Sequence, residues 1–129
     1  MKGFKLTDNE GFTRGKTAWG EGVTHIATGP GTGFCSPDLI HFYSHPLVAI
    51  FHNPIHANYQ HPQLWEVEAQ EPVYDDGGMK MGAKTVTALH RLPIPEVKII
   101  NHIAYGILCA VQVYHEPHWQ QWAKKWLEG

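Results

Sequence analysis

The sequence has few cysteines and no excess of charge of either sign. Cys35 and Cys109 are its only cysteines, and they stand far apart. Such a pair provides neither a disulfide framework nor half of a CxxC zinc site. Ten basic residues accompany twelve acidic ones, which gives a net charge of −2 at pH 7 with neutral histidines. This balance excludes the basic surface of a protein that works mainly on nucleic-acid backbones.

Long apolar segments are also missing. The first residues, MKGFKLTDNEGF, lack the apolar segment of a signal peptide, and no run approaches the roughly 18 apolar residues of a membrane span. Free thiols suit a reducing compartment, so we expect a cytoplasmic protein without membrane attachment. A length of 129 residues, with 43% hydrophobic residues, predicts a single globular domain, 1–129.

Three stretches resemble ligand-binding loops only in part. GFTRGKT at 11–17 ends like a phosphate-binding loop, but three residues separate its two glycines where that loop needs four. GPGTG at 29–33 lacks the spacing of a dinucleotide-binding fingerprint. Asp75 and Asp76 precede two glycines without the other ligands of a calcium loop. We interpret all three as turns and expect no cofactor.

Five of the ten histidines lie in one stretch, residues 39–61. Ile40 and Phe42 alternate there with His41 and Tyr43, which predicts a short strand with the two pairs on opposite faces. A short helix should follow from about His45 to Asn53. It would begin with Ser44 as N-cap and Pro46 in its first turn, and it would end before Pro54, which disfavours helical geometry in the preceding residue.

Two pairs of histidines in this stretch have the spacing of metal ligands on a helix. His41 and His45 are four residues apart, as are His52 and His56. Each pair spans a proline boundary, at Pro46 or at Pro54, so we expect no helical geometry to direct both rings at one ion. The sequence therefore predicts no metal site.

Alternating stretches predict a mostly antiparallel sheet of four to six short strands. In the clearest strand, 64–69, Leu64, Glu66 and Glu68 face one way and the residues between them face the other. The two glutamates could be acid/base or ligand groups, or they could form the solvent-facing side of a half-covered sheet.

Two helices are predicted at the C-terminal end. Apolar residues keep a helical spacing from Pro95 over about five turns, and Cys109 would be a small buried residue in this helix. A last helix begins near Pro117 and places three tryptophans on one side, at positions 119, 122 and 126. That Trp-rich helix could dock on the sheet or form a partner surface, such as a homo-oligomer contact. The fold expected is α+β, with a short central helix and both C-terminal helices packed on one face of the sheet.

Motifs over nearly the whole chain resemble a known family. They are WGEGVTH at 19–25, the IHFY, PL and NPIH segments between 40 and 56, LWEVE at 64–68, GMKMG at 78–82, LPIPEV at 92–97, ILCAVQVY at 107–114 and WAKKWLEG at 122–129. Together they resemble a group of small proteins of unknown function from bacteriophages, prophages and scattered bacteria. The resemblance implies a phage-type protein in the host cytoplasm, and it implies no particular activity.

A looser similarity, at the level of the fold, is to ADP-ribosyltransferase-like domains. These domains bind NAD with a His or Arg, a Tyr or Ser, and a Glu on successive strands. The similarity implies that His25 would hold the nicotinamide ribose, that Tyr43 would stack on nicotinamide, and that Glu66 or Glu68 would orient the attacking group.

Three functional hypotheses follow from the sequence. The first is a non-enzymatic accessory protein that binds a host or phage macromolecule, in particular a protein, through a surface rich in histidine and aromatic residues. That surface comprises His41, Tyr43, His52, Asn53 and His56. The second is a transferase directed at NAD or a nucleotide, which uses His25, Tyr43 and Glu66. The third is a metal-dependent hydrolase built on the histidines.

Overall fold

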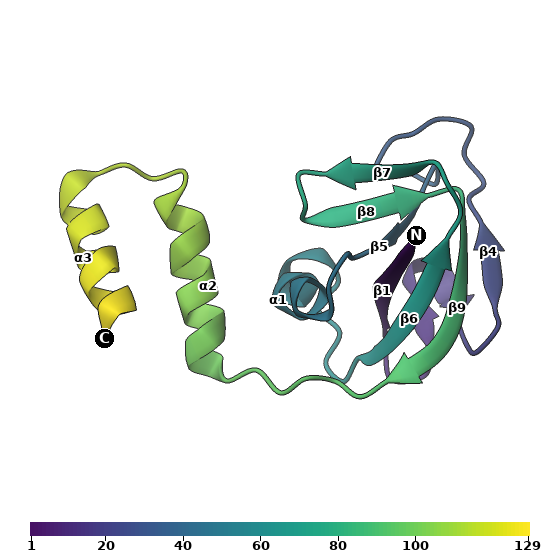
Figure 1. The fold of residues 1–129 in the computed structure, drawn as a ribbon, viewed down its shortest axis with the longest axis horizontal. Helices are drawn as coiled ribbons and strands as arrows, with labels where there is room; N and C mark the ends of the chain where they lie inside the picture. The colour runs from purple at the N-terminus through teal and green to yellow at the C-terminus, as the bar shows by residue number, and fades with distance from the viewer. The chain divides into compact units, whose positions relative to one another are not determined.

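The computed structural model describes residues 1–14 and 16–129 in full, and Gly15 through its backbone. The chain divides into two compact units, Met1–Pro95 and Glu96–Gly129 (Figure 1). The first unit contains all the strands, one α-helix and a short 3-10 helix at Arg14–Lys16, and the second contains two α-helices. The α+β class predicted from the sequence is confirmed. The single domain expected from the length of the chain stays a prediction.

The first unit is built from nine short strands among the described residues, more than the four to six expected. They are β1 (Lys2–Thr7), β2 (Phe12–Thr13), β3 (Thr17–Ala18), β4 (Thr24–Ile26), β5 (Ile40–Phe42), β6 (Gln63–Ala69), β7 (Val73–Asp76), β8 (Lys80–Ala83) and β9 (Thr85–Leu92). Their sheets have the orders β1-β6-β9-β4, β5-β8-β7 and β2-β3, and every pairing is antiparallel.

The two larger sheets meet at β1. Phe4 donates its backbone N–H to the carbonyl of Tyr43 at 2.8 Å, and Tyr43 donates to the carbonyl of Phe4 at 2.7 Å. Because Tyr43 directly follows β5, this pair joins the three-stranded sheet to the free edge of β1 (Figure 1). The face that the two sheets share encloses the main core, in which Phe42, Val67 and Val86 are fully buried.

The opposite face of β1 and β6 is covered by helix α1 (Pro46–His56). Leu6 and Leu64 are buried there against Ala49 of the helix. The alternation predicted for β6 is confirmed, because Leu64 lies on this face and Val67 lies in the main core. Beyond the helix the same face carries Glu66 and Glu68, which remain accessible to solvent.

Both predicted ends of α1 were wrong. The N-cap is His45, not Ser44, and its Nδ1 accepts a hydrogen bond from Leu47 N at 3.1 Å. The residue before a proline is held extended, so the cap must directly precede Pro46. At the other end the helix continues through Pro54 to His56. Pro54 lies in the last turn, where the missing N–H removes only one helical hydrogen bond.

The second unit consists of α2 (Ile99–Val111) and α3 (Pro117–Glu128). The predicted start of α2 at Pro95 was wrong, because the chain is still extended at Lys98, with φ of −68° and ψ of 150°, and the helix begins at Ile99. Cys109 was also predicted wrongly, since it is exposed. The start of α3 at Pro117 is confirmed, and the preceding Glu116 caps the helix by accepting from Trp119 N at 2.7 Å. The packing of both helices on the sheet stays a prediction.

In the part of the chain that the structure describes, no helix combines the length and the apolar character needed to cross a membrane.

Candidate functional site

Four of the predicted surface residues gather where the end of β5 meets α1. We call His41, Tyr43, His52 and His56 the histidine cluster. Three of its rings form a stack: the centroids of Tyr43 and His56 are 5.8 Å apart with planes at 12°, and those of His52 and His56 are 5.2 Å apart with planes at 17°. The ring of Tyr43 is also nearly parallel to that of His52, at 10°.

The helix brings its two histidines together because residues four apart lie one above the other on a helix face. This contact requires helical geometry across Pro54, which the sequence reasoning had excluded. Hydrogen bonds fix the rings from both sides. The hydroxyl of Tyr43 lies 2.7 Å from Nδ1 of His56, and Nδ1 of the buried His52 donates to the carbonyl of Val48 at 3.0 Å.

His41 lies beside this stack on the preceding strand. Its ring stacks on Phe34, with centroids 5.8 Å apart and planes at 7°. Among the described residues, its Nε2 is a buried nitrogen without a hydrogen-bond partner. Burial lowers the pKa of His41 from 6.5 to about 4, and the positive charges of Lys80 and Lys5 act in the same direction. The imidazole is therefore neutral at pH 7.

Lys5 supports His41 from the main core. Its ammonium donates to the carbonyl of His41 at 2.6 Å and lies 5.1 Å from the centroid of the Trp19 ring. Burial lowers the pKa of Lys5 to about 8. No sequence signal pointed to this lysine, because it alternates with Phe4 and Leu6 like a solvent-facing strand residue.

Two other groups of the cluster, His56 and Tyr43, also have a pKa shifted towards the uncharged form. Burial, and after it the charge of Lys80, lowers the pKa of His56. Burial raises the pKa of Tyr43 to about 12. His41, Tyr43 and His56 therefore offer flat rings whose neutral form is favoured and whose edges can form hydrogen bonds. Such rings suit stacking and hydrogen bonding to a partner.

Phe34 reaches His41 because a lysine organises the loop that carries it. Lys84 Nζ donates to three backbone carbonyls of this loop: Gly29 at 3.0 Å, Asp38 at 2.8 Å, and Gly31. The carboxylate of Asp38 in turn accepts from Gly33 N at 3.1 Å. The sequence had indicated only a flexible turn at 29–33.

Asn53, the fifth residue of the predicted surface, has a structural role. Its side-chain amide donates to the carbonyl of Tyr59 at 2.9 Å and its oxygen accepts from Tyr59 N at 3.0 Å. This clamp holds the chain after α1, where Asn58 adopts a left-handed conformation with φ of 56°.

The three residues of the transferase hypothesis do not converge. Glu66 is paired with Phe4, and Phe4 is paired with Tyr43, so Tyr43 and Glu66 lie on the same sheet face with one strand between them. His25 is paired with Val86 of the main core, and its ring packs against Trp19 with centroids 4.6 Å apart. It therefore lies on the opposite face.

The glutamates of β6 make ion pairs instead. Glu66 lies 2.9 Å from His90 Nε2 and 3.5 Å from Lys2 Nζ, and Glu68 lies 3.5 Å from the N-terminal ammonium. Glu68 is exposed and Glu66 is partly buried, which fits the solvent-facing side of a half-covered sheet, the second of the two interpretations of this strand. Among the described residues, no three His, Cys, Asp or Glu side chains are grouped so that they could hold a metal ion.

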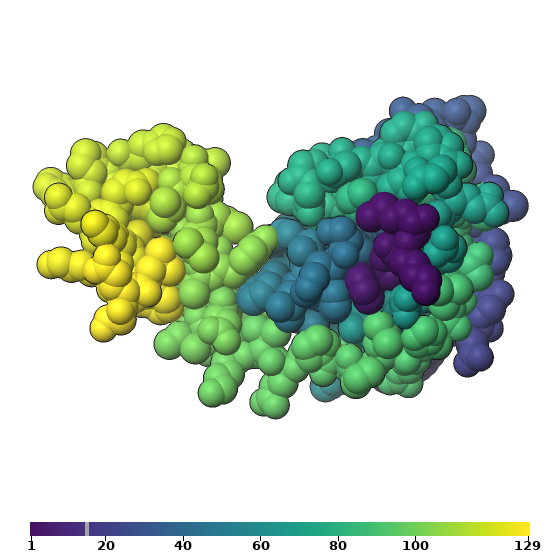
Figure 2. Space-filling view, in the orientation of Figure 1, coloured from purple at the N-terminus to yellow at the C-terminus, as the bar shows by residue number. Residues whose placement is uncertain are grey.

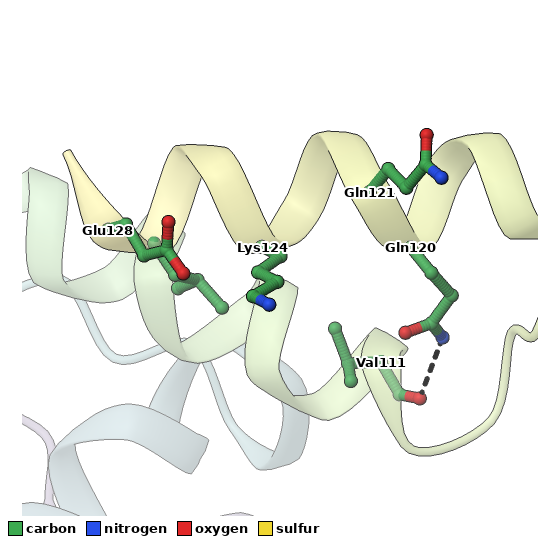
Figure 3. Close-up of a pocket in the computed structure, with 6 residues that line it drawn as sticks. Val111, Gln120, Gln121, Lys124 and Glu128 are labelled. Carbon is green, nitrogen blue, oxygen red and sulfur yellow. Dashed lines mark hydrogen bonds between the residues drawn. The ribbon is translucent and has the colours of Figure 1, made fainter.

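The helical unit has a shallow groove of its own between α2 and α3 (Figure 3). It is lined by Val111, Gln120, Gln121, Lys124, Leu127 and Glu128. Gln120 Nε2 closes one end by donating to the carbonyl of Val111 at 3.1 Å. The lining is that of a helix–helix contact, with no grouped catalytic side chains.

Comparisons with protein-family models, with curated proteins and with solved structures found no match to this chain. The resemblance to phage and prophage proteins stays a prediction.

Proposed function

We propose that this chain is a non-enzymatic binding protein that contacts a protein of phage or host origin through the histidine cluster. The observation that carries the proposal is the stack of Tyr43, His52 and His56, which joins the end of a strand to a helix. Rigid aromatic side chains on two connected elements give a large contact area at a low cost in conformational entropy.

The protonation properties of the cluster favour binding over catalysis. An efficient general acid or base has a pKa near the working pH. The environment moves the pKa of His41 down to about 4 and that of Tyr43 up to about 12, away from neutrality in both cases. The shifts leave uncharged groups, which lose little solvation free energy when a partner covers them.

Part of the cluster is accessible to a partner, because His41, Tyr43 and His56 are only partly buried. Figure 2 shows α1, in blue, at the molecular surface beside the first residues of the chain, in purple. The His56 ring is partly exposed, and Ile55 next to it is 71% exposed. An aromatic ring beside an accessible apolar side chain is a common anchor in protein interfaces.

The proposal is tested by affinity capture with the full chain from a lysate of the natural host. Wild type is compared with His56→Ala and with His41→Ala/Tyr43→Phe, and exposed His61 provides the control variant His61→Ala. We expect one protein to be captured by wild type and by the control and to be lost from both cluster variants. Circular dichroism melting must show that all four proteins are folded.

The captured protein is then purified and titrated by calorimetry. We expect the cluster variants to bind it at least tenfold more weakly than wild type, which corresponds to about 1.4 kcal/mol. Equal affinity for wild type and both variants would overturn the proposed surface. If NAD or a nucleotide raises the melting temperature while no protein binds, the binding-protein proposal is wrong.

A further inference from the structure

The helical unit Glu96–Gly129 has too small a core to be stable alone. In this unit, all of whose residues the structure describes, only Ile107 and Ala123 are buried. A unit of fewer than about 40 residues usually needs disulfides, a metal or association with another chain. Its cysteine, Cys109, is free.

The uncovered surface of this unit is concentrated on α2. Ile99 is 78% exposed, Ile100 57% and Ile103 48%, although the same helix buries Ile107. Helix α2 contains no Asp, Glu, Lys or Arg at any position. A surface helix of a stable monomer normally carries a charged face towards solvent. The composition of α2 is instead that of a helix packed against other protein surfaces on more than one side.

One line of residues on α2 has the spacing of a coiled-coil seam. Ile99, Ile103, Gly106 and Ala110 follow each other at intervals of four, three and four, which places them on one stripe. The first half of the stripe carries two large side chains and the second half two small ones. At Gly106 an added Cβ would meet no atom within 4 Å, so the small end is open.

We propose that α2 pairs in antiparallel orientation with α2 of a second copy of this chain along this stripe. A two-fold axis between Ile103 and Gly106 would place Ile103 of each copy against Gly106 of the other, and Ile99 against Ala110. Large side chains thus fill the space left by small ones, and the stripe is complementary to itself.

The absence of charge favours a second copy over an unrelated partner. In a two-fold antiparallel contact each residue near the axis lies close to the same residue of the other copy, so like charges on the stripe would repel each other. Helix α2 has no Asp, Glu, Lys or Arg side chain, so two copies do not repel each other. It also has no such charge with which to attract an acidic or basic partner. Two such hairpins would form a four-helix arrangement, with α3 of each copy on the outside. The seam thus lies on α2, whereas the sequence had pointed to the Trp-rich α3.

The test is the mass of the full chain in solution between about 1 and 100 μM. One chain has a mass of 14.6 kDa. The seam is one helix long, shorter than the contact that buries roughly 800 Å² per partner, so we expect a dimer with a dissociation constant on the order of 10 μM. Sedimentation velocity measures the monomer and dimer fractions across this range. A monomer at every concentration would overturn the proposal.

Variants locate the contact. Ile103→Glu should raise the dissociation constant of the dimer at least tenfold, because two carboxylates would then lie beside the two-fold axis and repel each other. The matched control is Leu108→Glu, since Leu108 is 50% exposed on the opposite side of the same helix. We expect this control to dimerise like wild type. If the two variants weaken the dimer equally, the seam is assigned to the wrong face.

A size exchange tests the orientation of the two helices. Gly106→Leu fills the open end and should weaken dimerisation, even though leucine favours the helix more than glycine does. The double variant Ile103→Ala/Gly106→Ile moves the large side chain to the other half of the stripe, and it should recover most of the lost affinity. If the double variant does not dimerise more tightly than Gly106→Leu, the antiparallel pairing is wrong.

Discussion

The hydroxyl oxygen of Tyr43 lies 2.7 Å from Nδ1 of His56, and the planes of the two rings are 12° apart. This hydrogen bond connects the sheet to the last turn of α1. Tyr43→Phe removes it and keeps the ring, so we expect the free energy of unfolding to fall by roughly 1 kcal/mol, as for one lost hydrogen bond. Urea unfolding at pH 7 measures the change.

Tyr74→Phe is the control for this hydroxyl. Tyr74 is also a half-buried strand residue, and its hydroxyl has no hydrogen bond among the described residues. We expect its removal to leave the urea midpoint unchanged. Equal effects of the two substitutions would show that the Tyr43–His56 hydrogen bond does not stabilise the fold.

A second prediction concerns the pH dependence of stability. The pKa of His41 is about 4 in the folded protein and 6.5 ordinarily, chiefly because burial disfavours the charged ring. Between these values the unfolded chain binds a proton that the folded chain does not. The stabilisation from neutral His41 is therefore complete above pH 6.5 and is lost as the pH falls towards 4.

The size of this effect is limited by solvent. One pKa unit corresponds to 1.36 kcal/mol, but the His41 side chain is only partly buried and screening reduces the value, so we expect roughly 1–2 kcal/mol. His41→Phe keeps the ring stacked on Phe34 and cannot be protonated. Urea unfolding from pH 7 to 4 should show a smaller loss of stability for this variant than for wild type, and His61→Gln should behave like wild type. Parallel curves for all three proteins would contradict the prediction.

Lys84 gives a third prediction, since its ammonium holds three carbonyls of the loop that carries Phe34. Lys84→Met keeps the length of the side chain but leaves these carbonyls without their donor. Hydrogen bonds from a charged group contribute about 1.5–3 kcal/mol each, and water can replace part of this, so we expect a loss of roughly 2–3 kcal/mol. Chymotrypsin should also cleave faster after Phe34.

The control for Lys84 is Lys2→Met. The ammonium of Lys2 is exposed and lies 3.5 Å from Glu66, and a surface ion pair of this kind contributes little stability. We expect neither the urea midpoint nor the cleavage rate to change in this variant. Unchanged cleavage at Phe34 in Lys84→Met itself would show that the loop keeps its shape without the lysine.

The parts of this structure that could be predicted from the sequence are those set by local periodicity. The alternation of Leu64, Glu66 and Glu68 with apolar residues predicted both faces of β6 correctly. All four residues of the histidine cluster belonged to the predicted surface, and alternation revealed that His41 and Tyr43 share a strand face. The stack with His56 was missed, since Pro54 was read as the end of the helix.

Other parts depend on contacts between distant segments, and no local pattern reveals them. Lys84 binds carbonyls of residues 29–38, and backbone carbonyls have no signature in a sequence. His25 has the same alternation whichever face is buried, and only its pairing with Val86 places it on the face of the main core. The sequence pattern alone therefore could not show that His25 and Glu66 lie on opposite faces of the sheet.

The last prediction concerns the place where β1 meets the end of β5. A Cβ added to Gly3 would lie 2.8 Å from both Cε2 of Phe42 and the carbonyl oxygen of Tyr43. Phe42 is fully buried, and the Tyr43 carbonyl accepts the hydrogen bond that joins the two sheets, so neither atom can move cheaply. We expect Gly3→Ala to lower the free energy of unfolding by about 2–3 kcal/mol, as for an overpacked core. At Gly20 an added Cβ has its nearest contact at 3.6 Å, with Val23, so Gly20→Ala should unfold at the wild-type urea concentration. If Gly3→Ala is as stable as Gly20→Ala, the sheets do not approach each other at this point as closely as the structure describes.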